Sequence, residues 1–81
     1  MEGPTVTFVW PQGPRTGILP VEWRDGWNVK NYLHSQPLRQ YPLLGIWHRC
    51  HRFNAKRQRV KLLYVPEPGD TIVLSLARRI S

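Results

Sequence analysis

With 81 residues and a net charge of +7, the chain is long enough for one small basic domain and too short for a two-domain enzyme. A hydrophobic content of 41% excludes a disordered chain, and no apolar run approaches the ~20 residues that span a bilayer. The single cysteine, Cys50, excludes an intrachain disulfide and an iron–sulfur cluster held by several thiolates. The first residues lack the features of a secretion signal, so we expect a cytoplasmic, intracellular protein or a component of a virus particle.

The N-terminal part of the chain predicts a hairpin. Residues Thr5–Trp10 alternate in the manner of a strand with one face on a core. The segment Pro11–Gly17 is dense in turn-forming residues and predicts a loop, and Ile18–Trp23 predicts a second strand. Because Pro20 has no N–H, we expect this second strand at an edge of the sheet. The pair Asp25-Gly26 predicts the turn that ends the hairpin.

A short helix is predicted next, over residues 28–35. Asn28 is a suitable N-cap, and three apolar residues follow at helical spacing on one side: Val29, Tyr32 and Leu33. Pro37 limits the helix, because the residue before a proline is pushed out of the helical region, although one more turn can form after it.

The C-terminal part predicts three further strands, at Gly45–Phe53, Arg59–Val65 and Thr71–Leu76. The polar segment 54–58 is expected to be a hairpin tip, and the proline-rich segment 66–70 a rigid turn. The order of elements therefore predicts an α+β fold, in which one short helix packs across a mixed sheet of four to five strands. We expect a single domain over residues 1–81, with its core over 5–76 and a basic tail over 77–81.

Two segments, Gly26–Leu33 and Val65–Leu74, carry a family resemblance that covers residues 5 to 76. The chain resembles the β-grasp fold of ubiquitin-like proteins, and within it the small sulfur carriers of thiamine and molybdopterin synthesis. In those carriers a Gly-Asp turn, here Gly69-Asp70, starts the last strand. They end in a flexible Gly-Gly whose carboxylate is adenylated, whereas this chain ends Arg79-Ile80-Ser81. The resemblance thus implies a β-grasp-like fold without that chemistry, and a sulfur-carrier activity would require the chain to continue to Gly-Gly.

Residues 48–51 form an H-x-C-H cluster, whose residue types occur in metal sites and in Cys–His nucleophile pairs. On a strand, His48 and Cys50 share one face and His51 points to the other, so even with His34 the ligands for tetrahedral zinc are incomplete. Arg49 and His51 point away from Cys50, and every carboxylate that could orient a base lies in a predicted turn. We therefore predict no metal, no cofactor, no small-molecule substrate and no enzymatic activity, and we expect Cys50 to pack as a small hydrophobic residue.

The four tryptophans are more than so small a core can easily bury, although one or two should belong to it. Exposed aromatic residues beside arginines have the composition of protein–protein hot spots. The best candidate partner-binding surface is one face of the strand 45–53, joined by one indole near the helix: Trp47, Arg49, His51, Phe53 and Trp27. The alternative is that Trp47 and Phe53 belong to the core and Arg49 lies at its edge.

Basic residues concentrate between positions 49 and 61, and no carboxylate separates Asp25 from Glu67. Such a run is either a solvated hairpin tip or a surface for an anionic partner. The candidate nucleic-acid-binding residues are Arg49, Arg52, Lys56, Arg57, Arg59, Lys61, Arg78 and Arg79.

These observations predict a non-catalytic interaction module, a small basic structural subunit that docks into a larger assembly such as a phage particle or a ribonucleoprotein. Its partner would be a protein, contacted through aromatic and arginine-rich surfaces, with no role for a membrane. The alternative is a protein that binds nucleic acid directly through the basic hairpin 49–61. Whether that hairpin meets phosphates or the carboxylates of an acidic protein stays open at this point.

Overall fold

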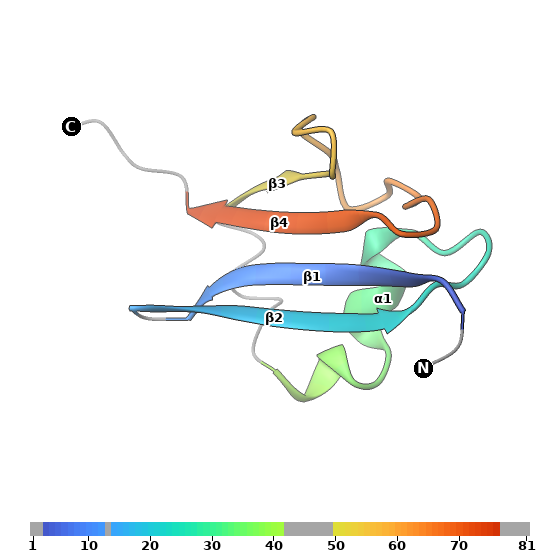
Figure 1. Ribbon diagram of the computed structural model, residues 1–81, viewed down its shortest axis with the longest axis horizontal. Coiled ribbons are helices and arrows are strands. Elements are labelled where there is room, and N and C mark those ends of the chain that lie inside the picture. Colours follow the sequence, from blue (N-terminus) through green and yellow to red (C-terminus); the bar gives the residue numbers. More distant parts are fainter. Residues whose placement is uncertain (1–2, 13, 42–49, 77–81) are drawn as a thin grey trace.

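The computed structural model describes residues 3–12, 14–41 and 50–76 (Figure 1). Four strands form one mixed sheet in the order β2-β1-β4-β3. Their bounds are β1 (Thr5–Gln12), β2 (Arg15–Glu22), β3 (Cys50–Phe53) and β4 (Thr71–Leu76). β1 pairs with β4 in parallel, and the two outer pairings are antiparallel. The helix α1 (Val29–His34) and the 3₁₀ helix η1 (Leu38–Gln40) complete the described chain, which confirms the predicted α+β class with a mixed sheet and one short helix.

The core lies between the sheet and α1, which Figure 1 shows behind the sheet. Val6, Phe8 and Trp10 of β1 are all buried, while Thr7 and Val9 between them are half-buried, so the predicted alternation of this strand is confirmed. The ring of Phe8 contacts the ring of Tyr32 on α1, with the two centroids 5.8 Å apart. The remaining buried apolar residues of the core cluster are Val21, Val29, Leu33, Leu38, Cys50, Ile72 and Leu74.

The predicted loop over Pro11–Gly17 is wrong, because both strands of the hairpin run further than the turn-forming residues suggest. β1 continues to Gln12, which pairs with Arg15 at the start of β2. The reason is a contact across the hairpin: Gly17 is opposite Trp10, and a Cβ at Gly17 would overlap the indole ring. The missing side chain of Gly17 thus makes the space in which the ring of Trp10 is buried.

The position of Pro20 at a sheet edge is confirmed, because β2 is the first strand in the sheet order. The N–H of Thr7 donates to the carbonyl of Asp70, so the backbone groups of Thr7 point toward β4. Groups at neighbouring residues of a strand alternate in direction, and Val6 and Phe8 therefore bond to β2. Pro20 is opposite Thr7, so its backbone faces away from β1 and its missing N–H removes no bond of the sheet.

The predicted helix over 28–35 is confirmed as α1, and its start is held by a capping box. The side chain of Asn28 accepts from the N–H of Asn31, and the side chain of Asn31 accepts from the N–H of Asn28. The further turn expected after Pro37 is η1. No helix within the described part of the chain is long and apolar enough to cross a bilayer.

The predicted strand Arg59–Val65 is wrong: only Arg59 forms a bridge, with Phe53. The carbonyls of Leu62 and Tyr64 instead accept from the first N–H groups of α1, at distances of 3.0 and 2.9 Å. The start of a helix leaves such donors without helical partners, so the segment is used to satisfy them rather than to extend the sheet. In the segment Gly45–Phe53, β3 is a strand as predicted, and residues 45–49 lie outside the described ranges.

Candidate interaction surface

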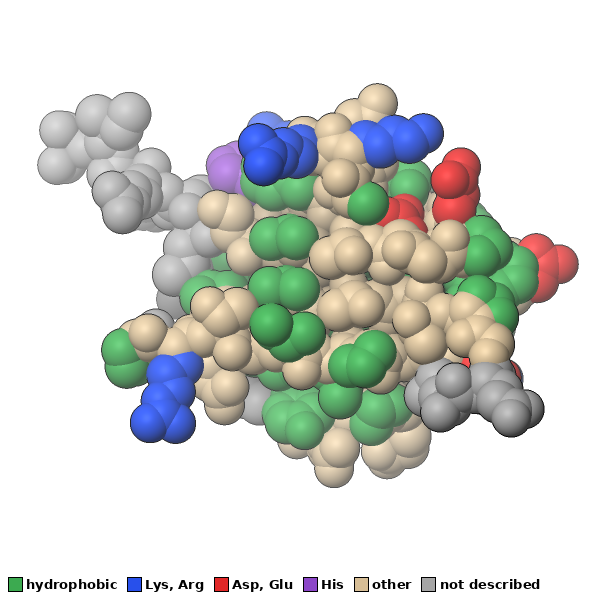
Figure 2. Space-filling model, viewed as in Figure 1, with side chains coloured by type: hydrophobic (Ala, Val, Ile, Leu, Met, Phe, Trp, Pro, Cys, Tyr) green, Lys and Arg blue, Asp and Glu red, His purple; other side chains and the backbone are tan. Residues whose placement is uncertain are grey.

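The face of the sheet opposite α1 carries a row of apolar side chains that crosses all four strands. The pairing register places Ile18 opposite Val9, Val9 beside Val73, and Val73 opposite Phe53. Side chains at paired positions of neighbouring strands point to the same face. We call these four residues the open-face row. Ile18 is 64% exposed and the other three are half-buried, and Figure 2 shows hydrophobic side chains running across this face.

Polar residues border the open-face row on both sides. Thr7 and Thr71 are paired on one side, and His51 and Ser75 are paired on the other. The ring of His51 contacts that of Phe53, with centroids 6.3 Å apart. Of the residues predicted to bind a partner, His51 and Phe53 therefore lie on this face. The two other residues expected with them, Trp47 and Arg49, lie outside the described ranges.

Trp27 does not join His51 and Phe53. It lies just before α1 and packs against Tyr32 on the helix side of the sheet, with ring centroids 5.3 Å apart. The guanidinium of Arg24 lies 5.0 Å from the centroid of the Trp27 ring, which is a cation–π geometry. Contacts within the molecule thus account for much of the surface of this indole.

The other described tryptophans are also used by the fold. Trp10 is only 5% exposed, which confirms the expectation that at least one indole belongs to the core. Trp23 is half-buried, and its Nε1–H donates to the carbonyl of Pro66 at 3.0 Å. Among the described residues, the candidate surface therefore consists of Phe53 and aliphatic side chains rather than of exposed indoles.

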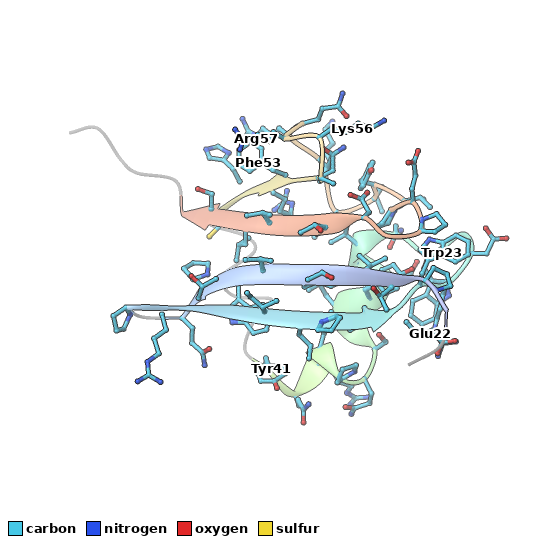
Figure 3. All side chains as sticks on the ribbon, viewed as in Figure 1. Glu22, Trp23, Tyr41, Phe53, Lys56 and Arg57 are labelled. Atoms are coloured by element: carbon cyan, nitrogen blue, oxygen red, sulfur yellow. The ribbon has the colours of Figure 1, made fainter. Side chains whose placement is uncertain are left out.

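A basic loop follows β3 at the edge of the sheet. We use this name for residues 54–61, which carry four exposed cations: Lys56, Arg57, Arg59 and Lys61. Figure 3 shows Lys56 and Arg57 beyond the edge strand, and Figure 2 shows Lys and Arg side chains gathered at that edge. The polar tip expected over 54–58 is confirmed as a loop. Arg52, also predicted with this group, is half-buried on β3, and Arg49, Arg78 and Arg79 lie outside the described ranges.

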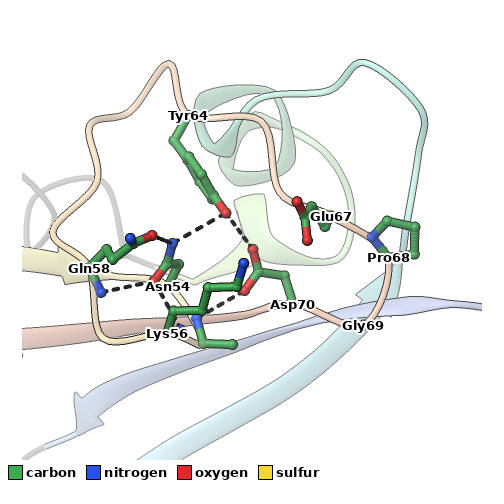
Figure 4. A pocket seen from close by; sticks show the side chains of 9 residues that line it. Asn54, Lys56, Gln58, Tyr64, Glu67, Pro68, Gly69 and Asp70 are labelled. Atoms are coloured by element: carbon green, nitrogen blue, oxygen red, sulfur yellow. Dashed lines mark hydrogen bonds between the residues drawn. The ribbon is translucent and has the colours of Figure 1, made fainter.

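The basic loop is anchored by a buried network around a small cavity of about 200 Å³ (Figure 4). The Asn54 side chain, from a residue only 6% exposed, accepts from the N–H groups of Lys56 and Gln58 through Oδ1. Its amide group donates to the hydroxyl of Tyr64 at 3.4 Å and to the side chain of Gln58 at 3.0 Å. The loop thus has an internal scaffold made by one side chain.

Asp70 ties this scaffold to the sheet. Its carboxylate accepts from the N–H of Ala55 at 3.0 Å, from the N–H of Thr71 at 2.8 Å and from the hydroxyl of Tyr64 at 2.7 Å. Asp70 therefore joins the basic loop, Tyr64 and the start of β4. The roles of Asn54 and Tyr64 were missed by the sequence analysis, and the only signal for them was a polar residue directly after a strand and a tyrosine before the Gly-Asp turn.

Two groups of the described residues have a pKa that is clearly shifted. Burial raises the pKa of the Tyr64 hydroxyl, and its hydrogen bond to Asp70 raises it further. Burial also raises the pKa of the Cys50 thiol, against a smaller opposite effect of the charge on Arg52. Cys50 is 8% exposed and belongs to the core, as predicted. Its raised pKa makes the thiolate, the reactive form, scarce at neutral pH.

Over the described ranges, no three His, Cys, Asp or Glu side chains are placed to hold a metal ion together. His48, the first residue of the H-x-C-H cluster, lies outside those ranges, and Cys50 and His51 point to opposite faces of β3. Comparison of the chain with protein-family models, with curated proteins and with solved structures finds no significant match.

Proposed function

We propose that this protein is a non-catalytic interaction module that docks onto a protein partner in a larger assembly, through the open-face row. The observation that carries the proposal is the alignment of four apolar side chains, one from each strand, on a sheet face that neither helix covers. Burial of such a surface contributes about 25 cal/mol for each Å² of apolar area removed from water. Phe53 at one end is the kind of residue that anchors an interface.

The polar groups outside the open-face row support a role without catalysis. The oxygens of Asp70 and the hydroxyl of Tyr64 are occupied in holding the loops together. The Cys50 thiol is buried and has a raised pKa, so it lacks the accessible thiolate that a nucleophile needs. These three residues, Asp70, Tyr64 and Cys50, have side chains that occur in catalytic sites, and each has a structural role here.

A β-grasp-like identity of the fold is part of this proposal. The element order strand, strand, helix, strands supports it, as does the pairing of the first strand with the last at the centre of the sheet. A compact module of this kind suits a phage particle or a ribonucleoprotein, where a small subunit is held by its neighbours. The open-face row then meets a second apolar surface rather than a small substrate.

The test replaces Val73 by arginine at the centre of the open-face row. A tagged wild-type chain and the Val73→Arg variant are purified from the native source, and the proteins captured with each are compared by quantitative mass spectrometry. Because a buried charge without a partner is costly, we expect the true partner to be depleted at least about tenfold with Val73→Arg. The matched control is Gln40→Arg, which adds the same charge at an exposed position of η1.

Circular dichroism checks that both variants remain folded. Equal capture of every protein by the wild-type chain and a folded Val73→Arg variant would contradict the proposal. Equal depletion by the Gln40→Arg control would show that added charge, rather than the row itself, is responsible.

A further inference from the structure

We propose that the basic loop is a preformed binding site for the phosphate backbone of a single-stranded nucleic acid, beside the protein surface proposed above and sharing Phe53 with it. Four cations lie within six residues of chain, at Lys56, Arg57, Arg59 and Lys61, and all are exposed. None of them forms an ion pair with a carboxylate of the described chain, where the one salt bridge joins Arg24 and Glu22. Their charges are therefore available to an external anion.

The loop that carries these cations is held in one shape before any partner arrives. Asn54 accepts from the N–H groups of Lys56 and Gln58, and Asp70 accepts from the N–H of Ala55. The N–H of Arg57 also donates to the carbonyl of Asn54, at 2.9 Å. A loop that is already ordered loses less conformational entropy on binding, so its cations bind an anion more tightly than those of a mobile tail.

The surroundings of the loop favour a nucleic acid over an acidic protein. The rings of His51 and Phe53 contact each other on β3, directly before the loop. Bases stack on aromatic side chains while cations follow the phosphates, and this combination is typical of sites for single strands. Glu67 lines the same small cavity as Lys56, whereas Arg57 is not part of that lining.

The experiment measures binding of a fluorescein-labelled 15-nucleotide oligothymidylate by fluorescence anisotropy. Neutralising one phosphate of a single strand contributes about −0.7 to the slope of log K against log salt, so four contacts give about −2.8. We expect the affinity to fall about 50-fold between 50 and 200 mM KCl. Arg57→Gln removes one phosphate contact, so the slope should change from about −2.8 to about −2.1. The affinity of this variant should then fall only about 20-fold between 50 and 200 mM KCl.

Two further variants serve as comparisons. Lys56→Gln removes one charge at a residue that does not have the positive φ of 60° found at Arg57. It should reproduce the effect of Arg57→Gln. Arg15→Gln removes an exposed charge at the start of β2, outside the loop, and should leave the slope at its wild-type value.

Three results would overturn the inference. The first is the absence of binding at 50 mM KCl, and the second is a slope that Arg57→Gln and Lys56→Gln leave unchanged. The third is displacement of the oligonucleotide by poly-L-glutamate as effectively as by unlabelled oligothymidylate at equal charge, which would assign the loop to acidic proteins. The Val73→Arg variant keeps all four cations of the basic loop and should still bind the oligonucleotide, so loss of the protein partner and loss of nucleic-acid binding are distinguishable.

Discussion

Asp70 is the residue on which the basic loop, the turn at Tyr64 and the start of β4 converge. A carboxylate that is only 8% exposed is costly to desolvate, and here three donors offset that cost. Tyr64 links Asp70 to Asn54 by donating to one and accepting from the other. Removing the Tyr64 hydroxyl would therefore weaken the anchoring of the loop without changing its charge.

At this scale we predict the effect of Tyr64→Phe on stability and on its pH dependence. Loss of the hydrogen bond to a buried carboxylate should lower the free energy of unfolding by about 1–3 kcal/mol at pH 7. Because the pKa of Tyr64 is raised in the folded state, its contribution is fully present below its ordinary value of 10.0 and is lost as the pH rises through the folded pKa. Urea unfolding should show that the wild-type advantage over Tyr64→Phe declines above pH 10.

The control for this prediction is Tyr41→Phe, which removes the hydroxyl of an exposed tyrosine and keeps the ring that contacts Trp10. Its stability should follow the wild type at every pH. A difference between wild type and Tyr64→Phe that stays constant from pH 7 to 11 would show that the raised pKa has no influence on stability.

At the scale of elements, the hairpin of β1 and β2 depends on the packing of the large Trp10 ring against Gly17, which has no side chain. Trp10 lies over Gly17 on the opposite strand, and both are buried. A glycine inside a strand weakens it, because it has no side chain to pack. Here the ring of Trp10 covers the glycine, and the apolar area buried in this contact offsets that loss. The contact explains why the strands extend through a stretch that is rich in turn-forming residues.

We predict that Gly17→Ala destabilises the protein by about 1–3 kcal/mol, the usual cost of adding a methyl group to a filled site. The new Cβ must displace the ring of Trp10, since the two would overlap. Chemical denaturation measures the change, and a shift in tryptophan fluorescence should accompany it. Thr16→Ala, at the exposed neighbour, should change stability by less than about 0.5 kcal/mol. Equal stability of Gly17→Ala and wild type would show that the indole can move freely.

At the scale of the whole molecule, charge is unevenly distributed. The described carboxylates lie at or just after the end of β2, or just before the start of β4: Glu22, Asp25, Glu67 and Asp70. Because Glu22 pairs with Thr5 and Thr71 pairs with Thr7, these two strand ends lie at the same end of the sheet. None of the four cations of the basic loop forms an ion pair with these described carboxylates, and a net charge of +7 leaves repulsion that the fold must tolerate.

This distribution predicts that salt stabilises the isolated protein. Raising KCl from 10 to 100 mM shortens the screening length from about 30 to 10 Å. Relief of about 0.5 kcal/mol of repulsion should raise Tm by about 2–4 °C in a domain of this size, as measured by circular dichroism. The double variant Lys56→Gln, Arg59→Gln should show a smaller rise. A Tm that falls with added salt would mean that attractive ion pairs outweigh the repulsion.

The sequence alone was sufficient where the governing energies are local. The alternation of Val6 and Phe8 marked a strand with one buried face, and Asn28 with Pro37 marked the two ends of a short helix. Pro20 identified an edge strand because a missing N–H is a property of the residue itself. These features depend on a residue and its nearest neighbours, so no knowledge of distant contacts was needed.

Which segments pair depends instead on contacts between residues that are far apart along the chain. Gly17 joined a strand because Trp10 lies across from it, and the segment of Leu62 and Tyr64 left the sheet because the start of α1, some thirty residues earlier, offered N–H donors. The open-face row exists only through the register of four strands, since Ile18 and Phe53 belong to opposite edges of the sheet. Each of these outcomes is set by competition among partners that are far apart along the chain, which a local pattern does not contain.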